Sequence, residues 1–213
     1  MISITLVILL LTCVISFTAF SNDKIIQDLI FYPTAITNRN QWYRFITCGF
    51  IHADFMHLAF NMYTFYLFGG MVENAFNSIF PQSGKALYTI MYFASLVVCL
   101  LPTYIQHRNN YHYRSLGASG AVSAVIFIGV FLNPTMGMGI FPIPFHIPAF
   151  VFGPLYLLVS AYLAKKGRGN INHSAHIWGA VFGIVYLIVT CQFMSSFRPV
   201  TSFVNEISAY LGR

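Results

Sequence analysis

A serine and two histidines stand near the starts of three apolar segments. Ser119 lies in a Gly-Ala-Ser-Gly stretch where one segment begins, and His57 and His176 stand near the starts of two others. A serine hydroxyl becomes a useful nucleophile when a neighbouring base takes its proton. Histidine suits that role because its unperturbed pKa is about 6.5. Ser119 and His176 could therefore form a nucleophile–base pair for acyl transfer.

Acyl transfer also needs donors for the oxyanion of its transition state, and removal of one donor typically costs about 10²–10³ in rate. His57 and Asn61 are four residues apart, so on a helix they share one face. Both side chains can present an N–H group. The backbone amide of Ser119, at a helix start, is a third candidate donor.

Small residues surround the proposed nucleophile and base. Gly117 and Gly120 flank Ser119, and Gly179 and Gly183 follow His176 by three and seven residues. Glycines at such spacing allow two membrane helices to approach closely. Each motif alone has a simpler explanation as helix packing or as interhelical hydrogen bonding, but their order and common sidedness favour a reactive site.

The elements that carry these residues are predicted to cross a membrane. The chain has 213 residues, of which 57% are hydrophobic and only 8% charged. Its mean hydropathy is +0.70. Soluble domains carry about 25% charged residues, so the composition predicts an all-α integral membrane protein. We expect one domain over residues 1–213 with six apolar spans, at about 2–20, 55–75, 86–106, 117–132, 149–164 and 173–193.

Spans that cross a bilayer in succession alternate in direction, so the second, fourth and sixth spans begin on the same side. His57, Ser119 and His176 are then expected at similar depth. A cleaved signal peptide is the alternative for the first run, although no Lys or Arg precedes it. The Pro-rich residues 133–148 predict an extended connection between two spans. Residues 201–211, after the last span, predict a short interfacial helix.

Several other classes of site find no support. The five acidic residues are predicted to lie in loops or at span ends, which favours a Ser-His dyad over a triad and excludes a pair of buried catalytic aspartates. The zinc motif His-Glu-x-x-His is absent, so we expect neither a metal nor a cofactor. The net charge of +6 is spread over loops, which favours contact with lipid headgroups over nucleic acid. The four cysteines are interpreted as apolar packing residues.

Taken together, these motifs resemble the rhomboid family of intramembrane serine proteases over roughly residues 40–193. The resemblance rests on three motifs around Ser119, His176 and His57, and on two weaker ones. These are Gly117-x-Ser119-Gly120, Ala175-His176-x-x-Gly179-x-x-x-Gly183, His52-x₄-His57-x₃-Asn61, Arg44 with Thr47, and Gly70-x-x-Glu73.

The resemblance implies a six-helix bundle that cleaves single-span membrane proteins. Ser119 would be the nucleophile and His176 the base, while His57, Asn61 and the Ser119 amide would form the oxyanion hole. His52 would be a nearby structural or water-organising residue. Many members carry an aromatic residue four positions after the serine, but this chain has Ser123 there. We therefore expect the His176 ring to be held in a different way.

The family also implies a multi-pass protein of the plasma (inner) membrane, with a cytoplasmic N-terminus and a site facing the extracytoplasmic side. That orientation puts most of the 11 lysines and arginines outside, against the positive-inside rule. The expected partners are transmembrane protein substrates and the lipid bilayer, with no nucleic acid and the oligomeric state left open. The alternatives are a catalytically silent homologue that binds membrane proteins, and a small transporter.

Overall fold

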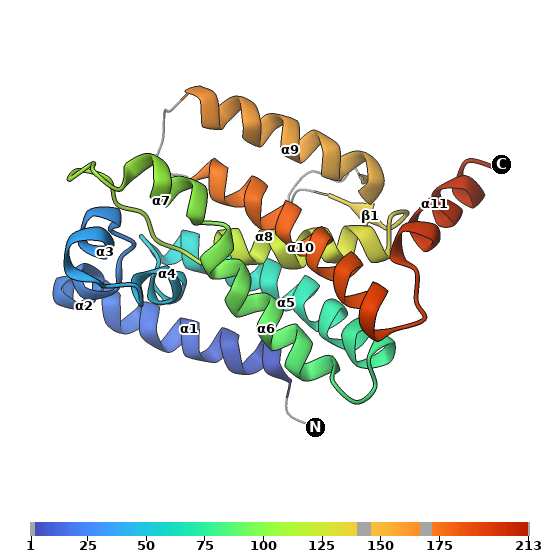
Figure 1. Ribbon diagram of the computed structural model, residues 1–213, viewed down its shortest axis with the longest axis horizontal. Coiled ribbons are helices and arrows are strands. Elements are labelled where there is room, and N and C mark those ends of the chain that lie inside the picture. The colour runs from blue at the N-terminus through green and yellow to red at the C-terminus, as the bar shows by residue number, and fades with distance from the viewer. Residues whose placement is uncertain (1–2, 140–145, 167–171, 213) are drawn as a thin grey trace.

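The computed structural model describes residues 3–139, 146–166 and 172–212, and its long elements are all helices (Figure 1). The long helices are α1 (Ile4–Phe20), α5 (Phe55–Ile79), α6 (Gly84–Val98), α8 (Ser119–Leu132), α9 (Ala149–Lys166) and α10 (His173–Met194). The shorter elements are α2 (Asp23–Leu29), α3 (Pro33–Arg39), α4 (Arg44–Thr47), the 3₁₀ helix η1 (Cys48–Phe50), α7 (Leu101–His107), α11 (Pro199–Tyr210) and the strands β1 (Gly137–Met138) and β2 (Ile147–Pro148). The all-helical prediction is confirmed.

Helix α8 lies at the centre of the bundle (Figure 1). It packs against α10, α5, α6 and α9. Ala121, Ala124, Val125 and Ile128 on this helix are fully buried. A helix that is apolar on all sides belongs inside other helices, so α8 forms the core around which the rest are arranged.

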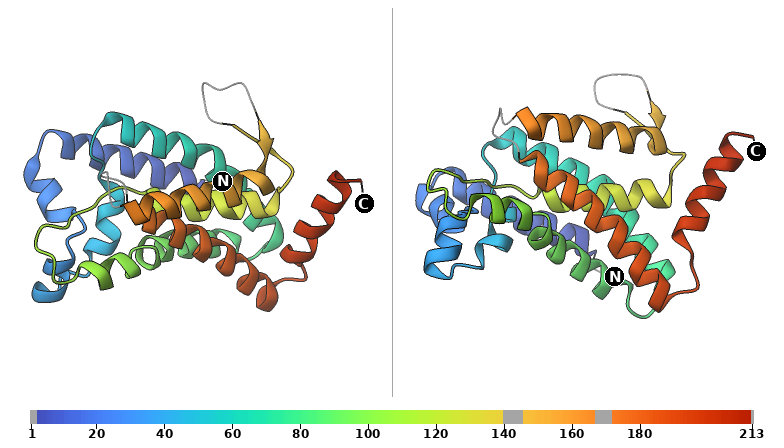
Figure 2. Two further views of the ribbon diagram at one scale, coloured as in Figure 1. Left: turned by 90° about the horizontal axis from the view of Figure 1, so that it is seen from above. Right: turned by 45° about the horizontal axis from the view of Figure 1, so that its top comes forward.

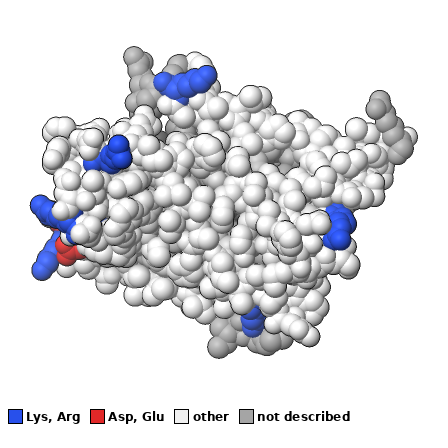
Figure 3. Space-filling model, viewed as in Figure 1, with Lys and Arg blue, Asp and Glu red and all other residues white. Residues whose placement is uncertain are grey.

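Two helical stretches, Gly84–His107 and His173–Met194, are long and apolar enough to cross a membrane. Three shorter apolar helices, Ile4–Phe20, Ser119–Leu132 and Ala149–Lys165, accompany them. The broad middle of the face in Figure 3 carries no charged side chain, and the Lys and Arg side chains stand around its rim. An uncharged belt of this kind suits contact with hydrocarbon.

Helix α5 continues beyond its predicted end near residue 75, and Glu73 is buried inside it. The prediction that every acidic residue lies in a loop or at a span end is therefore wrong for Glu73. The carboxylate accepts hydrogen bonds from the Ser3 hydroxyl (2.7 Å) and from the amides of Ile4 (2.7 Å) and Thr5 (2.9 Å). The two amides belong to the first turn of α1, whose N–H groups have no partner within the helix, and this end of the helix carries a partial positive charge. Both features stabilise a buried carboxylate here.

The predicted third span is interrupted. Helix α6 ends at Val98 and α7 begins at Leu101, with Cys99 and Leu100 between them. Pro102 lies in the first turn of α7, where its missing N–H costs nothing. The short α7 therefore takes its own direction at the end of the bundle that holds the starts of α8 and α10 (Figure 2).

The connection after α8 is non-helical where the structure describes it. It opens with a turn, in which the Met136 amide donates to the Asn133 carbonyl at 3.2 Å, and is extended at β1 and β2. β1 and β2 pair antiparallel, with Gly137 opposite Pro148 and Met138 opposite Ile147. The rest of the predicted 133–148 connection, residues 140–145, lies outside the described residues. So do residues 167–171. Near the C-terminus, α11 lies at the edge of the bundle (Figure 2), where Phe203 stacks on Phe131 of α8 with ring centroids 4.6 Å apart. It covers most of the range 201–211 that is predicted to be helical.

The segment between α1 and α5 is compact and is organised around a buried arginine. The guanidinium of Arg44 donates to the backbone carbonyls of Gln27 and Ile30, each at 2.8 Å, and to the side chain of Gln41 at 2.7 Å. Thr47 donates to the Leu29 carbonyl at 2.9 Å. These carbonyls lie at the C-terminal end of α2, where no N–H of the helix is left to pair with them, and the bonds therefore hold α2 against α4.

All four cysteines are free. Cys48, Cys99 and Cys191 are buried, and Cys13 is partly buried. Their interpretation as packing residues rather than disulfides is confirmed.

Candidate active site

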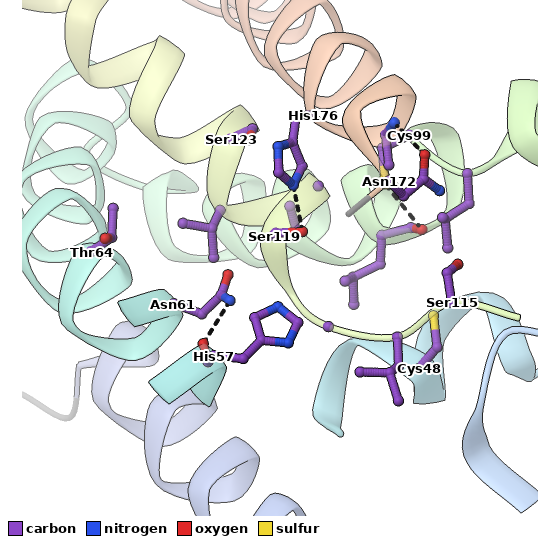
Figure 4. Close-up of a pocket in the computed structure, with 18 of the residues that line it drawn as sticks. Cys48, His57, Asn61, Thr64, Cys99, Ser115, Ser119, Ser123, Asn172 and His176 are labelled. Carbon is purple, nitrogen blue, oxygen red and sulfur yellow. Dashed lines mark hydrogen bonds between the residues drawn. The ribbon is translucent and has the colours of Figure 1, made fainter. Parts of the chain in front are cut away.

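Ser119 and His176 meet at one end of the bundle. Ser119 is the first residue of α8 and His176 lies in the first turn of α10. The Nε2 atom of His176 is 2.7 Å from the Ser119 hydroxyl oxygen (Figure 4). Both side chains line a cavity of about 190 Å³. A serine hydroxyl at this distance from an imidazole nitrogen has the geometry of a nucleophile with its base.

Glycines bring the backbones of α8 and α10 into direct contact. A Cβ atom added at Gly179 would overlap the carbonyl oxygen of Gly120, and one at Gly183 would lie 2.5 Å from the carbonyl oxygen of Ala124. No larger residue fits at either position without separating the helices. The spacing Gly179–Gly183, one helical turn, therefore sets the distance across which Ser119 and His176 meet.

Gly117 shapes the approach to α8. Its φ of +113° lies in the region that favours glycine, and its amide donates to the Cys48 carbonyl at 2.9 Å. A Cβ atom here would lie 2.9 Å from Cε1 and 3.0 Å from Nε2 of His57. Gly117 therefore turns the chain into α8 and leaves room for the His57 ring beside the cavity.

His57 and Asn61 project from the first turns of α5 toward the same cavity (Figure 4). The start of α5 is capped by Asp54, which accepts from the His57 amide at 2.8 Å. The amide of Ala53 approaches Nδ1 of His57 at 3.5 Å, an arrangement that leaves Nε2 as the protonated nitrogen of a neutral ring. Asn61 donates one side-chain N–H to the His57 carbonyl at 2.9 Å and retains a second.

The Ser119 amide belongs to the first turn of α8, whose N–H groups have no partner within the helix. None of the described residues accepts a hydrogen bond from it. The three predicted donors, His57, Asn61 and this amide, thus all lie at the cavity. The structure brings them together, and their role in binding an oxyanion stays a prediction.

His52 lies behind the cavity and is fully buried. Its Nδ1 is 2.9 Å from the Ser16 hydroxyl, which itself donates to the Phe50 carbonyl at 2.8 Å. Its Nε2 accepts from the Ala118 amide at 3.4 Å. Burial, with a smaller effect of the neighbouring His57 ring, lowers the pKa of His52 to about 3. A neutral His52 therefore links α1 to the residue that precedes Ser119.

Asn172 holds the start of α10 in place. Its side-chain oxygen accepts from the Ala175 amide at 3.1 Å, the usual N-cap contact. Its amide nitrogen donates to the Thr103 hydroxyl of α7 at 3.1 Å. An Asn immediately before an apolar run is a cap signal that the sequence alone offers.

Tyr156 is the residue at the site that sequence reasoning missed. Its hydroxyl oxygen lies 3.1 Å from Nδ1 of His176, and the two rings are near-parallel, at 18°, with centroids 6.5 Å apart. The residue comes from α9, not from α8 four residues after Ser119. The aromatic residue that contacts the His176 ring is therefore a tyrosine of α9, whereas many rhomboids place one four residues after the serine. This agrees with the expectation that the ring is held differently here.

Of the other histidines, His173 contacts the ring of His176, whereas His107 lies away from the pair. His173 is the first residue of α10, as expected for a polar residue at a helix start, and its ring meets that of His176 edge-on at 5.8 Å. His107 stacks on Tyr113 at 3.9 Å in the connection that precedes α8.

A comparison with known protein families identifies the family of this chain. The family model for the rhomboid domain matches residues 39–193, well over half of the chain. This chain belongs to the rhomboid family. Rhomboid proteins are integral membrane proteins, and the same class follows here.

Individual rhomboid relatives are distant in sequence but cover most of this chain. The putative rhomboid protease YdcA of Bacillus subtilis (strain 168) is 28% identical over 165 residues, which are 76% of this chain and 73% of the relative. The rhomboid protease GlpG of Haemophilus influenzae is 26% identical over 187 residues, 86% of this chain and 88% of the relative. The chloroplastic rhomboid-like protein 11 of Arabidopsis thaliana is 26% identical over 162 residues, 73% of this chain and 55% of the relative.

Proposed function

We propose that this rhomboid is an intramembrane serine endopeptidase that cleaves single-span membrane proteins. The observation that carries the proposal is the 2.7 Å contact between the Ser119 hydroxyl and His176 Nε2 inside a cavity of an apolar helical bundle. The names of the bacterial relatives, which include the word protease, point the same way.

The reaction begins when Ser119 Oγ attacks the carbonyl carbon of the scissile peptide bond and its proton passes to His176 Nε2. The tetrahedral intermediate then breaks its C–N bond, and His176 returns the proton to the leaving amine. Water attacks the resulting acyl-enzyme, with His176 again as base, and releases the second product and the free Ser119.

The oxyanion of the intermediate is bound by N–H groups of His57, Asn61 and the Ser119 backbone. Donors that are fixed before the reaction stabilise the developing charge without having to reorganise. His57 and Asn61 are fixed because they lie on the capped first turns of α5, and Ser119 because its helix is the buried centre of the bundle.

The proposed membrane arrangement has six crossings, by α1, α5, α6 with α7, α8, α9 and α10. The starts of α5, α8 and α10 then share one side, which we assign to the extracytoplasmic face of the plasma membrane. Two candidates stand for gating access to the site: α9 with the preceding Pro-rich connection, or the cap at 165–172. Residues 140–145 and 167–171 of these segments lie outside the described residues.

A fluorophosphonate probe tests the proposal, because such probes react covalently with activated serines. We expect the purified protein in detergent to be labelled, Ser119→Ala to lose the label, and Ser202→Ala, on the distant α11, to keep it. In parallel, a panel of single-span proteins should be cleaved by the parent chain and not by Ser119→Ala. Labelling that persists in Ser119→Ala would remove this serine from the mechanism.

The alternative is a silent homologue that binds membrane proteins without cutting them. It predicts that the parent chain captures single-span proteins but is neither labelled nor active. The proximity of the intact serine and histidine argues against this alternative. A transporter is also disfavoured, because the polar residues of the cavity gather at one end of the helices.

A further inference from the structure

We propose that Tyr156 is a positioning residue, whose hydroxyl accepts the Nδ1–H of His176 and thereby holds the imidazole with Nε2 facing Ser119. The inference rests on the serine protease function proposed above. It assigns to α9 a part in the reaction that no motif around Ser119 or His176 indicates.

Both ring nitrogens of His176 have a partner in the structure. Nε2 contacts Ser119 at 2.7 Å, and Nδ1 contacts Tyr156 at 3.1 Å. A neutral imidazole has one protonated and one bare nitrogen. For Nε2 to accept the serine proton it must be the bare one, so Nδ1 carries the hydrogen and donates it to the phenol oxygen. In the reactive tautomer the 3.1 Å contact is therefore an Nδ1–H···O hydrogen bond from His176 to Tyr156.

The phenol ring of Tyr156 is itself held in place by its neighbours. The Tyr156 ring is near-parallel to Phe152 at 6.1 Å and meets Phe127 of α8 at 5.7 Å. The hydroxyls of Ser123 and Ser160 lie beside its oxygen, and both of these serines are buried. A tyrosine held by ring contacts on both sides and by polar groups at its tip has little freedom to leave His176.

His176 has no carboxylate partner among the described residues that line the cavity. In a Ser-His-Asp triad a carboxylate binds Nδ1 of the histidine and fixes its tautomer. Among the described residues that line this cavity, none is an aspartate or glutamate. The Tyr156 hydroxyl lies beside Nδ1, where a triad has its carboxylate, and acts as a neutral hydrogen-bond acceptor. The bond strengthens when His176 becomes positively charged during the reaction, as hydrogen bonds to charged groups do.

The test compares Tyr156→Phe, which removes only the hydroxyl, with Tyr162→Phe, a matched change on the exposed face of α9. Both are compared with the parent chain and Ser119→Ala in detergent. Three quantities are measured: the rate of fluorophosphonate labelling, kcat and KM on a single-span substrate, and the midpoint of thermal unfolding.

We expect Tyr156→Phe to lower the labelling rate and kcat about tenfold, the size of one hydrogen bond to a group that becomes charged. KM should change less than twofold, since the hydroxyl acts through His176 rather than on the substrate. The unfolding midpoint should stay within a few degrees, and Tyr162→Phe should behave as the parent. Parent-like kcat and labelling in Tyr156→Phe would overturn the inference while the proposed function stands.

A spectroscopic measurement keeps the inference testable even if Tyr156→Phe is unstable. In ¹⁵N spectra of histidine-labelled protein, with the signals of His176 assigned by comparison with His176→Ala, the parent should carry its proton on Nδ1. A His176 protonated on Nε2 instead would overturn the assignment. If the parent is not labelled at Ser119 at all, the proposed function fails and the inference falls with it.

Discussion

Helix α8 meets α10 through its backbone and meets α9 through side chains. On the α10 side, Gly179 and Gly183 leave no space between the carbonyls of one helix and the Cα atoms of the other. On the α9 side, Phe127 and Tyr156 interpose aromatic rings. In the proposed mechanism the first interface sets the distance between Ser119 and His176, and the second sets the orientation of the His176 ring.

The difference in construction implies a difference in tolerance. A backbone contact cannot relax when a side chain is added, because neither partner has a rotamer to change. An aromatic contact can lose one polar atom and keep its shape. We therefore expect changes at the α8–α10 interface to abolish activity and changes at the α8–α9 interface to reduce it.

The largest effect is expected for Gly179→Val. Its side chain would overlap the Gly120 carbonyl, so α10 must move away from α8 and carry His176 with it. Since a displacement of about 1 Å at a catalytic group can cost about 100-fold, we expect substrate cleavage to fall to background. Gly70→Ala is the matched control, because a Cβ at Gly70 meets nothing within 4 Å. A Gly179→Val protein with parent-like cleavage would refute the claim that this interface sets the distance.

A smaller loss is expected when one oxyanion donor is removed from α5. Asn61→Ala should lower kcat by about 100-fold, the lower end of the range for such donors, with little change in KM. The fold should survive because the residue's recorded bond is to the backbone of its own helix. Kinetics on a single-span substrate, with thermal unfolding as the check on folding, measure this. A variant that loses less than threefold in kcat would exclude Asn61 from the oxyanion hole.

The smallest effect on activity is expected at a third interface, between α1 and α5. A Cβ at Gly69 would lie 2.6 Å from a methyl group of Thr5, at the opposite end of α5 from His57. Because a side chain can shift where a backbone cannot, Gly69→Ala should cost about 1–3 kcal/mol of unfolding free energy and leave kcat within twofold. Gly70→Ala should be neutral or stabilise by about 0.5–1 kcal/mol. Equal stability of the two variants would contradict this account of Gly69.

The sequence predicted the α8–α10 side of the site well and the α9 side poorly, for physical reasons. Residues three, four and seven positions apart share a helix face, so His176, Gly179 and Gly183 can be placed relative to one another without coordinates. Helix α9 is apolar almost throughout, and nothing in such a sequence shows which face turns inward. The contact between Tyr156 and His176 depends on that rotation, and so could be found only in three dimensions.

The errors along the chain have a similar origin. The sequence predicts that the second span ends near residue 75 and that Glu73 lies at its end. In the structure Gly69 accommodates Thr5, and Glu73 binds the first turn of α1. Both residues contact α1, and the sequence around them does not show which helix packs against them.

The burial of the native thiols has a practical consequence. Because Cys48, Cys99 and Cys191 are enclosed and Cys13 is only partly open, maleimide dyes should react sparingly with the parent chain. A cysteine introduced at Lys165, which is exposed at the end of α9, would then be a selective attachment point for a fluorophore. Such a reporter would follow excursions of α9, and with it the Tyr156 hydroxyl, while a substrate enters and its products leave.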